Sequence, residues 1–481
     1  MNKKTLNQKA TRAGIYYTIA NMFLKGCVFL TLPLFTRILS TNDFGIYNNY
    51  MAYEGLLSAI LGLGLYGTVK NAKFDFKENF NEYLSSVLSL SLVVFVFVVL
   101  ILNLFYPFYG NYLGFSRFVT NCLVFQSFGS YLIYFYGSKL NIEFEYKSYI
   151  FLSFFNTIVN ILLSFILIIY IFPNERYLGR ILGSALPLIL ISIYIIVLIF
   201  INGKTRYEKK YWKYALTIGL PLIPHVVSQS LLSQFDRIMI GNMTSLSYSG
   251  IYSYMYTICT ITYVICISLD NAWNPWVYHK LNESKKKEIL NSSKQYIFLF
   301  TFITICFICI MPEITKLMAD KSYWGAIDLL IPLSLSNYFI FLYMIPVGIE
   351  YYYKKTKYIS FGTFLAAIFN LILNYFAIKF FGYKSAAYTT LISYMLLFIF
   401  HWIIASKYDV NSIYSLKYII KNIFVLFIVS IFIFLVNLFF NEKISIIIRY
   451  VIVVIFIVIS LLKLKEFLEE RKNEKNFKKS I

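Results

Sequence analysis

The sequence has few charged residues for its length. Asp, Glu, Lys and Arg make up 14% of the 481 residues and only three residues are His, whereas soluble domains carry about 25% charged residues. Hydrophobic residues account for 59%, and a single core cannot hide such an excess because cores stop growing near ~250–300 residues. This composition excludes a soluble enzyme and a disordered chain. It predicts a protein that lies largely within the lipid bilayer.

Catalytic and metal-binding patterns are scarce as well. The six Cys residues all fall in apolar stretches, and the pair Cys306 and Cys309 has no second pair with which to form a zinc site. No H-E-x-x-H motif is present. Gly203-Lys204-Thr205 resembles the end of a phosphate-binding loop, but Leu198 stands where its first glycine would be. With only short loops left for catalytic groups, we expect a transporter, not an enzyme, and no metal or other cofactor.

What the sequence has in abundance is long apolar runs. A helix needs ~20 apolar residues to cross a bilayer, and about fourteen such runs are present, which predicts an all-α polytopic membrane protein. The predicted spans are residues 14–36, 46–68, 83–105, 116–137, 149–172, 181–201, 215–240, 248–269, 295–312, 326–347, 358–378, 384–405, 418–438 and 444–462.

The basic residues follow the membrane topology. The net charge is +21, but Lys and Arg sit in short runs between the spans, and the loops on the side of the two termini carry most of them. Cytoplasmic loops are enriched in Lys and Arg, so we expect both termini in the cytoplasm. The pattern indicates contact with anionic lipids and no nucleic-acid partner.

Two short motifs recur about two hundred residues apart. The repeated segments are Phe35-Thr36-Arg37-Ile38 with Phe235-Asp236-Arg237-Ile238, and Gly45-Ile46-Tyr47 with Gly250-Ile251-Tyr252. Both copies lie at the junction between a span that runs outward and the next span, which runs inward. Because an even number of spans separates the copies, the two halves have the same orientation, as in transporters built from parallel repeats.

The repeat predicts the domain organisation. We expect an N-terminal six-helix lobe at residues 1–205 and a parallel-related C-terminal six-helix lobe at residues 206–410. Two additional transmembrane helices then occupy residues 411–462, and a basic cytoplasmic tail follows at residues 463–481.

The first span carries polar residues on one helix face. Thr18, Asn21 and Lys25 follow one another at steps of three and four residues, which aligns them on one side of a helix. A charge deep in a span is costly, so it usually faces the bundle interior or a wet cavity. These residues are candidates to line a cationic site for an anionic substrate. Alternatively, Lys25 forms a structural pair with a carboxylate such as Glu54.

The seventh span has a similar polar stripe, which includes His225 and Gln229 and ends at Asp236 and Arg237. It either faces a cavity or supplies interhelical hydrogen bonds. The repeat-equivalent residues Arg37 and Arg237 could hold a phosphate or close an outer gate, and for Arg37 interfacial anchoring is the alternative.

Two helix ends are also predicted. Ser40 and Asp43 have the spacing of a capping box, so Asp43 is first of all a cap. Asp270, Asn271 and Pro275 are expected to end the eighth span, and the amphipathic run 276–281 to lie on the cytoplasmic headgroups.

The first motif region also carries a family resemblance. Leu32-Pro33-Leu34-Phe35-Thr36-Arg37-Ile38-Leu39-Ser40-Thr41-Asn42-Asp43-Phe44-Gly45-Ile46-Tyr47 resembles the Wzx-type polysaccharide flippases. These bacterial exporters share a superfamily with the multidrug-extrusion (MATE) transporters and the lipid II flippases. The stretch from Pro221 through Asp236-Arg237 to Gly250-Ile251-Tyr252 is similar to the second half of that family.

The resemblance implies a function. Such a flippase moves undecaprenyl-pyrophosphate-linked oligosaccharides across the bacterial plasma membrane by alternating access, for capsule, O-antigen or exopolysaccharide synthesis. Its partners would be the lipid-linked oligosaccharide, membrane lipids and other assembly proteins such as a polysaccharide polymerase. Lys25 matches the place of first-helix cationic residues in related lipid flippases.

No ATP site is recognisable, so an ion gradient or removal of the product must drive net transport. Glu54 and Asp236 are candidates for proton or sodium coupling. The alternatives are an ion-coupled multidrug exporter of the same superfamily, and an enzyme or non-transporting component of a glycan assembly complex. An exporter of cationic drugs would need carboxylates deep in the first lobe, whereas Lys25 favours an anionic cargo.

Overall fold

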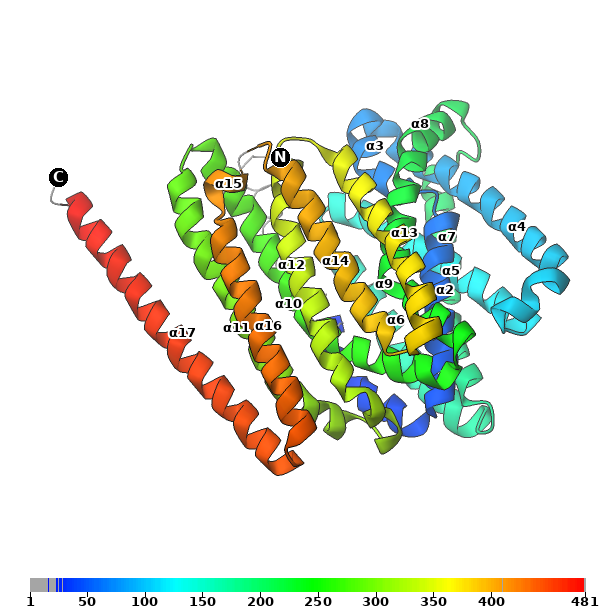
Figure 1. Ribbon diagram of the computed structural model, residues 1–481. Helices are drawn as coiled ribbons and strands as arrows, with labels where there is room; N and C mark the ends of the chain where they lie inside the picture. Colours follow the sequence, from blue (N-terminus) through cyan, green and yellow to red (C-terminus); the bar gives the residue numbers. More distant parts are fainter. Residues whose placement is uncertain (1–15, 17–22, 25, 28, 409, 480–481) are drawn as a thin grey trace. The chain divides into compact units, whose positions relative to one another are not determined.

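The computed structural model describes residue 16 and residues 23–24, 26–27, 29–408 and 410–479 (Figure 1). Its contacts divide the chain into two compact units. The first unit comprises Met1–Ser253 and Ala367–Tyr383, and the second comprises Tyr254–Ala366 and Lys384–Ile481. These units differ from the two lobes predicted from the sequence repeat, whose boundaries lie near residues 205 and 410. The lobe boundaries stay predictions.

The predicted membrane fold is confirmed. In the described part of the chain, 12 helices are long and apolar enough to span a membrane, and the bent pair Thr41–Leu61 and Leu65–Asp75 makes a thirteenth. The shorter apolar helix Phe29–Ile38 coincides with the last part of the first predicted span, whose earlier part lies mostly outside the described residues. Each of the other predicted spans overlaps one of these helices.

After the helix Phe29–Ile38, the first unit contains the helices from α2 to α9, the start of α10 and the end of α13. They are α2 (Thr41–Leu61), α3 (Val69–Asp75), α4 (Phe80–Leu113), α5 (Arg117–Ile142), α6 (Tyr146–Ile166), α7 (Arg176–Gly203), α8 (Lys209–Gly219) and α9 (Ile223–Met243), with the short elements η1 (Leu65–Thr68), η2 (Lys77–Asn79), η3 (Leu167–Ile171) and η4 (Leu220–Leu222).

Local sequence signals set both ends of α2. The Ser40 hydroxyl accepts from the Asp43 amide at 3.1 Å, and the Asp43 carboxylate accepts from the Ser40 amide at 3.3 Å. This capping box satisfies two amides that a helix start leaves unpaired, so the predicted role of Asp43 is confirmed. The helix breaks after Leu61, where Gly64 has φ 66°, a conformation that glycine adopts easily. The chain then turns by 50° into η1 and α3.

Two buried tyrosines in the core of the first unit have hydroxyl partners. Tyr83 shares a 2.6 Å hydrogen bond with the Thr68 hydroxyl, and Tyr131 shares one of 2.6 Å with the Ser91 hydroxyl. Lipid offers no substitute for such bonds, so a membrane protein must satisfy buried hydroxyls internally.

The second unit contains the rest of α10 and α13 and all of the later helices. They are α10 (Leu246–Asn282), α11 (Lys286–Met318), η5 (Lys321–Leu329), α12 (Leu330–Tyr352), α13 (Thr356–Phe381), α14 (Ser385–Ala405), α15 (Val410–Ile413), α16 (Leu416–Phe439) and α17 (Glu442–Lys479). Within this unit α12 packs on α14, and α11 packs on α16 and α17. Figure 1 shows α16 in orange beside α11, and α17 in red at the C-terminal end.

The predicted end of the eighth span is wrong. α10 continues through Asp270 and Pro275 to Asn282. Tertiary contacts hold the segment helical: Trp273 stacks on Tyr296 with ring centroids 4.2 Å apart, and the Tyr278 hydroxyl donates to the carbonyl of Gly348 at 2.9 Å. Val277 and Leu281, which belong to the predicted headgroup-bound run, are buried. Proline is tolerated in spans where neighbouring helices supply contacts.

The last helix is longer than predicted. α17 runs from Glu442 to Lys479, so the predicted tail 463–481 begins inside this helix. Its apolar part, Glu442–Lys463, is the candidate span.

Candidate functional site

Three predicted site residues lie outside the described residues: Thr18, Asn21 and Lys25. Their roles therefore stay predictions. Arg37 is described, one residue before the end of the helix Phe29–Ile38, and its side chain is exposed.

The polar stripe of the seventh span lies on α9. His225 and Gln229 are one turn apart on this helix; Gln229 is exposed and His225 is half-buried, with no hydrogen-bond partner for its Nδ1 among the described residues. Near the other end, Arg237 Nη1 donates to Gln234 Oε1 at 3.0 Å. These positions are compatible with the predicted binding roles and do not test them.

The two copies of the sequence repeat meet in the first unit. A Cβ atom built on Gly45 of α2 would lie 1.8 Å from the carbonyl oxygen of Leu246, and one built on Gly250 of α10 would lie 2.0 Å from the carbonyl oxygen of Thr41. The backbones of the two helices therefore touch at repeat-equivalent glycines. We call this contact the glycine crossing. Only glycine allows such an approach, as in other closely packed membrane helices.

Polar side chains surround the glycine crossing. The hydroxyls of Thr41 and Ser247 are 2.6 Å apart, and the Ser249 hydroxyl donates to Asn49 Oδ1 at 2.7 Å. Asn49 also lies against Gly241 of α9, where a Cβ atom would come within 2.1 Å of its Nδ2. Small residues and hydroxyls thus join α2 to α9 and α10.

Replacing one of the crossing glycines should separate these helices. We expect Gly45→Ala to lower the melting temperature of the purified protein, because overpacking costs about 1–3 kcal/mol. Gly26→Ala is the matched control: no described atom lies within 4 Å of its added Cβ, so the change should be neutral or slightly stabilising. Equal melting temperatures for the two variants would contradict the tight contact.

A buried carboxylate lies close to the crossing. Asp236 of α9 is 1% exposed; its Oδ1 accepts from Asn374 Nδ2 at 2.7 Å and its Oδ2 accepts from the Tyr252 hydroxyl at 2.8 Å. Asn374 Nδ2 also donates to Asn370 Oδ1 at 3.0 Å. This group, the Asp236 cluster, joins α9, α10 and α13 within the first unit. The two donors named here, Asn374 and Tyr252, are neutral.

The cluster occurs in one copy of the repeat. The residue equivalent to Asp236 is Thr36, whose hydroxyl donates to the carbonyl of Leu32 in its own helix. Asp236 belongs to the repeat motif, whereas Asn370 and Asn374 lie outside both motifs and were not among the predicted site residues. Their four-residue spacing within an apolar run places them on one helix face, and this was the signal that could have found them.

The other predicted ion-coupling residue, Glu54, is also buried. It lies on α2, is 7% exposed, and hydrogen-bonds the Ser130 side chain. Its Oε1 has no hydrogen-bond partner among the described residues. One turn earlier on α2, the Tyr50 hydroxyl donates to Gln126 Oε1 at 2.9 Å. The structure does not bring Glu54 and Asp236 into one cluster.

The first unit contains a further cation that was not among the predicted site residues. Arg180 of α7 is half-buried and donates from Nη1 to Asn160 Oδ1 at 2.6 Å and to the Ser164 hydroxyl at 2.7 Å. Its guanidinium carbon is 4.1 Å from the ring centre of Phe35 and 4.4 Å from that of Tyr47. Both rings belong to the repeat motifs. Arg180 immediately precedes the predicted span 181–201, a position that is typical of a loop residue.

The sequence matches a known family. Residues 10–279 match the family model described as polysaccharide biosynthesis protein. A protein of the Lsg locus of Haemophilus influenzae is 26% identical over 381 residues, which cover 75% of this chain and 89% of the relative. The capsular polysaccharide biosynthesis protein CapF of Staphylococcus aureus is 24% identical over 360 residues, which cover 68% and 81%.

Solved structures share the fold. The lipid II flippase MurJ in an inward closed conformation gives a TM-score of 0.71 at 18% identity, with 94% of this chain and 99% of that chain covered. An inward-facing MATE family multidrug transporter of the MOP superfamily gives 0.64 at 13% identity, with 82% and 98% covered. At these identities the similarity concerns the fold.

The expected all-α membrane fold agrees with these solved structures. Because the family model matches more than half of the chain, this multi-pass membrane protein belongs to the polysaccharide biosynthesis protein family.

Proposed function

We propose that this protein flips undecaprenyl-pyrophosphate-linked oligosaccharides from the cytoplasmic to the outer leaflet of a bacterial plasma membrane, with both termini in the cytoplasm. The observation that carries the proposal is the combination of a polysaccharide biosynthesis family with the fold of a lipid II flippase. The glycan would then enter capsule, O-antigen or exopolysaccharide assembly. A polysaccharide polymerase that takes up the product is the natural partner.

The head group needs cations and neutral hydrogen-bond donors. A pyrophosphate is recognised by Arg and Lys side chains, and a sugar by amides, hydroxyls and imidazoles. We assign the first role to Lys25, Arg37 and Arg237, and the second to Thr18, Asn21, His225 and Gln229. The exposure of Arg37 and Gln229 supports access of a ligand to these two side chains.

Alternating access requires a contact that opens and closes. The glycine crossing suits this role because it relies on close backbone contact and a few hydrogen bonds, which small residues can make and break repeatedly. Its position at the start of α2 and α10 places it, in the predicted topology, at the outer side of the membrane. We propose that it closes the outer end while the head group enters from the cytoplasm.

An ion gradient would supply the driving force, and the Asp236 cluster supplies suitable chemistry. A buried carboxylate that accepts from an asparagine amide and a tyrosine hydroxyl can take up a proton, or can bind a hard cation such as sodium if the amide turns its oxygen toward the ion. Either event neutralises a charge whose burial is costly. The burial of Asp236, Asn370 and Asn374 supports a coupling role at this position.

The second candidate function is an ion-coupled multidrug exporter of the same superfamily. The observation that favours it is Glu54, a buried carboxylate in α2 with one oxygen lacking a partner among the described residues. Such a group could bind a cationic drug. Arg180, held by neutral groups in the same unit, is unfavourable for a cationic cargo.

Deletion of the gene in its own host tests the proposal. We expect lipid-linked oligosaccharide to accumulate in the cytoplasmic leaflet, and surface polysaccharide to be lost, with drug sensitivity unchanged. The wild-type gene and a Lys25→Arg variant should restore surface polysaccharide, whereas Lys25→Ala should restore less than about a tenth, because losing an ionic contact in a poorly solvated site costs roughly 1.5–3 kcal/mol.

Expression of each variant in the membrane is the control. Normal surface polysaccharide in the deletion strain, together with raised drug sensitivity, would favour the exporter and contradict the flippase.

A further inference from the structure

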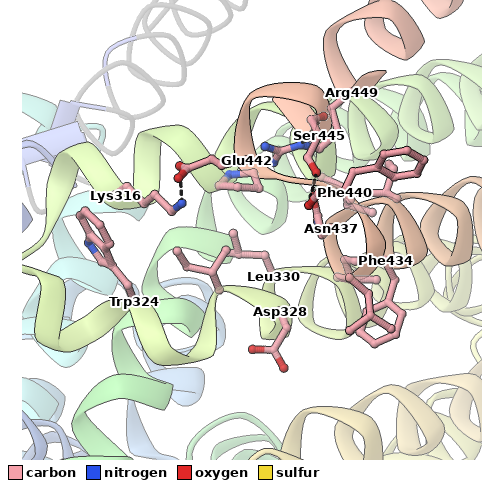
Figure 2. A pocket seen from close by; sticks show the side chains of 16 residues that line it. Lys316, Trp324, Asp328, Leu330, Phe434, Asn437, Phe440, Glu442, Ser445 and Arg449 are labelled. Atoms are coloured by element: carbon pink, nitrogen blue, oxygen red, sulfur yellow. Dashed lines mark hydrogen bonds and ion pairs between the residues drawn. The ribbon is translucent and has the colours of Figure 1, made fainter. Parts of the chain in front are cut away.

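The second unit contains a cavity that the proposed transport cycle does not use. Its volume is about 640 Å³, and it lies between α11, η5, α12, α16 and α17 (Figure 2). α11 ends at Met318, α16 ends at Phe439, and α17 begins at Glu442. The cavity therefore extends to the level where these helices end, and lipid headgroups are expected at the ends of membrane-spanning helices.

Charged side chains of both signs line this cavity. At its rim, Lys316 Nζ of α11 lies 2.6 Å from Glu442 Oε1 of α17, and Figure 2 shows the two side chains pointing toward one another. Asp328 of η5 is a second carboxylate in the wall, and it pairs with Lys384 Nζ at 2.7 Å.

A second ion pair lies deeper. Arg449 is seven residues after Glu442 on α17, which is about 10 Å along the helix. It is 3% exposed, lines the cavity, and forms an ion pair with Glu313 of α11. Arg449 Nη1 and Glu313 Oε2 have no hydrogen-bond partner among the described residues. A buried charged group without its full set of hydrogen bonds is unfavourable, so this pair can still gain from a polar ligand.

One side of the cavity is apolar and exposed. Phe434 is 43% exposed and Leu438 is 63% exposed, both in the last turns of α16, and Phe440, which follows the helix, is 50% exposed. Aromatic and aliphatic side chains at this depth suit the upper part of an acyl chain. The cavity thus combines a charged inner wall with an apolar side that faces lipid.

We propose that this cavity binds the headgroup of a zwitterionic phospholipid that carries a primary ammonium, with its phosphate facing Arg449 and Lys316 and its ammonium facing Glu442 and Asp328. The acyl chains run over the apolar side. The lipid is a component of the surrounding membrane and not the transported glycan lipid.

The charge balance selects this class of lipid. Lys316 and Arg449 supply two positive charges to the wall, and Glu442 and Asp328 supply two negative charges. An anionic lipid would meet no excess of positive charge. A choline lipid has the same phosphate but no N–H donor for the carboxylates. In a lipid with an ammonium headgroup, the phosphate accepts from the basic side chains and the ammonium donates to the carboxylates. These charge-assisted hydrogen bonds are stronger than neutral ones.

Native mass spectrometry of the purified full chain tests the proposal. The protein in detergent is titrated separately with phosphatidylethanolamine, phosphatidylcholine and phosphatidylglycerol of identical acyl chains. We expect phosphatidylethanolamine to bind on the order of tenfold more tightly than phosphatidylcholine, since one charge-assisted hydrogen bond corresponds to about that ratio.

A substitution in the wall makes the test sharper. Glu442→Gln removes one negative charge at an exposed position, where the side chain is 62% accessible, so the protein should still fold. The positive charge then dominates, and we expect the preference to change from phosphatidylethanolamine to phosphatidylglycerol. Glu175→Gln, at an exposed residue of the first unit, is the matched control and should keep the wild-type preference.

Three results would overturn the proposal: equal retention of all three lipids, a preference of the wild type for phosphatidylglycerol, or an unchanged preference in Glu442→Gln. The melting temperature of each variant checks that it folds. The assay involves no glycan lipid, so its outcome is independent of the proposed transport function.

Discussion

Oxidation of a Thr41→Cys/Ser247→Cys double variant should stop export of the glycan, and reduction should restore it. The two hydroxyls are 2.6 Å apart in the glycine crossing, a separation that brings two cysteines within reach of a disulfide. If α2 and α10 must separate in every cycle, a covalent bond here fixes one state. We expect surface polysaccharide to fall at least tenfold under oxidation.

The background for this experiment must lack the six native cysteines. Each single cysteine variant is the control, and it should export normally with or without oxidant. Quantitative disulfide formation with undiminished export would show that the crossing stays closed throughout transport, which would contradict its role as a gate.

Asp236→Asn should abolish ion-driven transport while leaving the protein folded. The amide keeps the shape of the carboxylate and can still accept from Tyr252 or Asn374, which contact Asp236 at 2.8 Å and 2.7 Å. What it loses is the charge that a sodium ion or proton would neutralise. We expect the transport rate to fall at least tenfold and to stop responding to sodium and pH gradients, which can be measured in vesicles with imposed gradients.

The control is the same Asp→Asn substitution at Asp43. Asp43→Asn alters the capping box of α2 on an exposed surface, so it should reduce stability by no more than about 1 kcal/mol and leave ion dependence intact. Full gradient-driven transport by Asp236→Asn would remove this residue from the coupling mechanism and leave Glu54 as the candidate.

Local and periodic signals in the sequence were enough to predict the membrane helices and the start of α2. Each span depends on about twenty consecutive apolar residues, and the capping box depends on Ser40 and Asp43, three residues apart. Features of this kind depend only on residues that are close together in the sequence. The glycines of the repeat were also visible as a pattern, because the same motif occurs twice.

Features that depend on distant contacts could not be predicted. Asp236 and Asn374 are 138 residues apart, and Arg449 and Glu313 are 136 residues apart. The expected break of α10 at Pro275 was wrong for the same reason. Helix propensity disfavours proline, but packing of Trp273 on Tyr296 and of Tyr278 on Gly348 keeps the segment helical. The sequence indicates the helix propensity of this segment, but it does not show which distant residues pack against it.

Movement of a lipid-linked oligosaccharide by the purified chain tests the central claim most directly. Vesicles containing the full-length protein and an undecaprenyl-pyrophosphate oligosaccharide are given a sodium or proton gradient, and a membrane-impermeant glycosidase outside reports the leaflet of the glycan. The account predicts that accessible glycan increases with time in wild-type vesicles, and that vesicles with Asp236→Asn or the disulfide-locked variant match protein-free vesicles. Wild-type vesicles in which the accessible glycan never exceeds that of protein-free vesicles would contradict it.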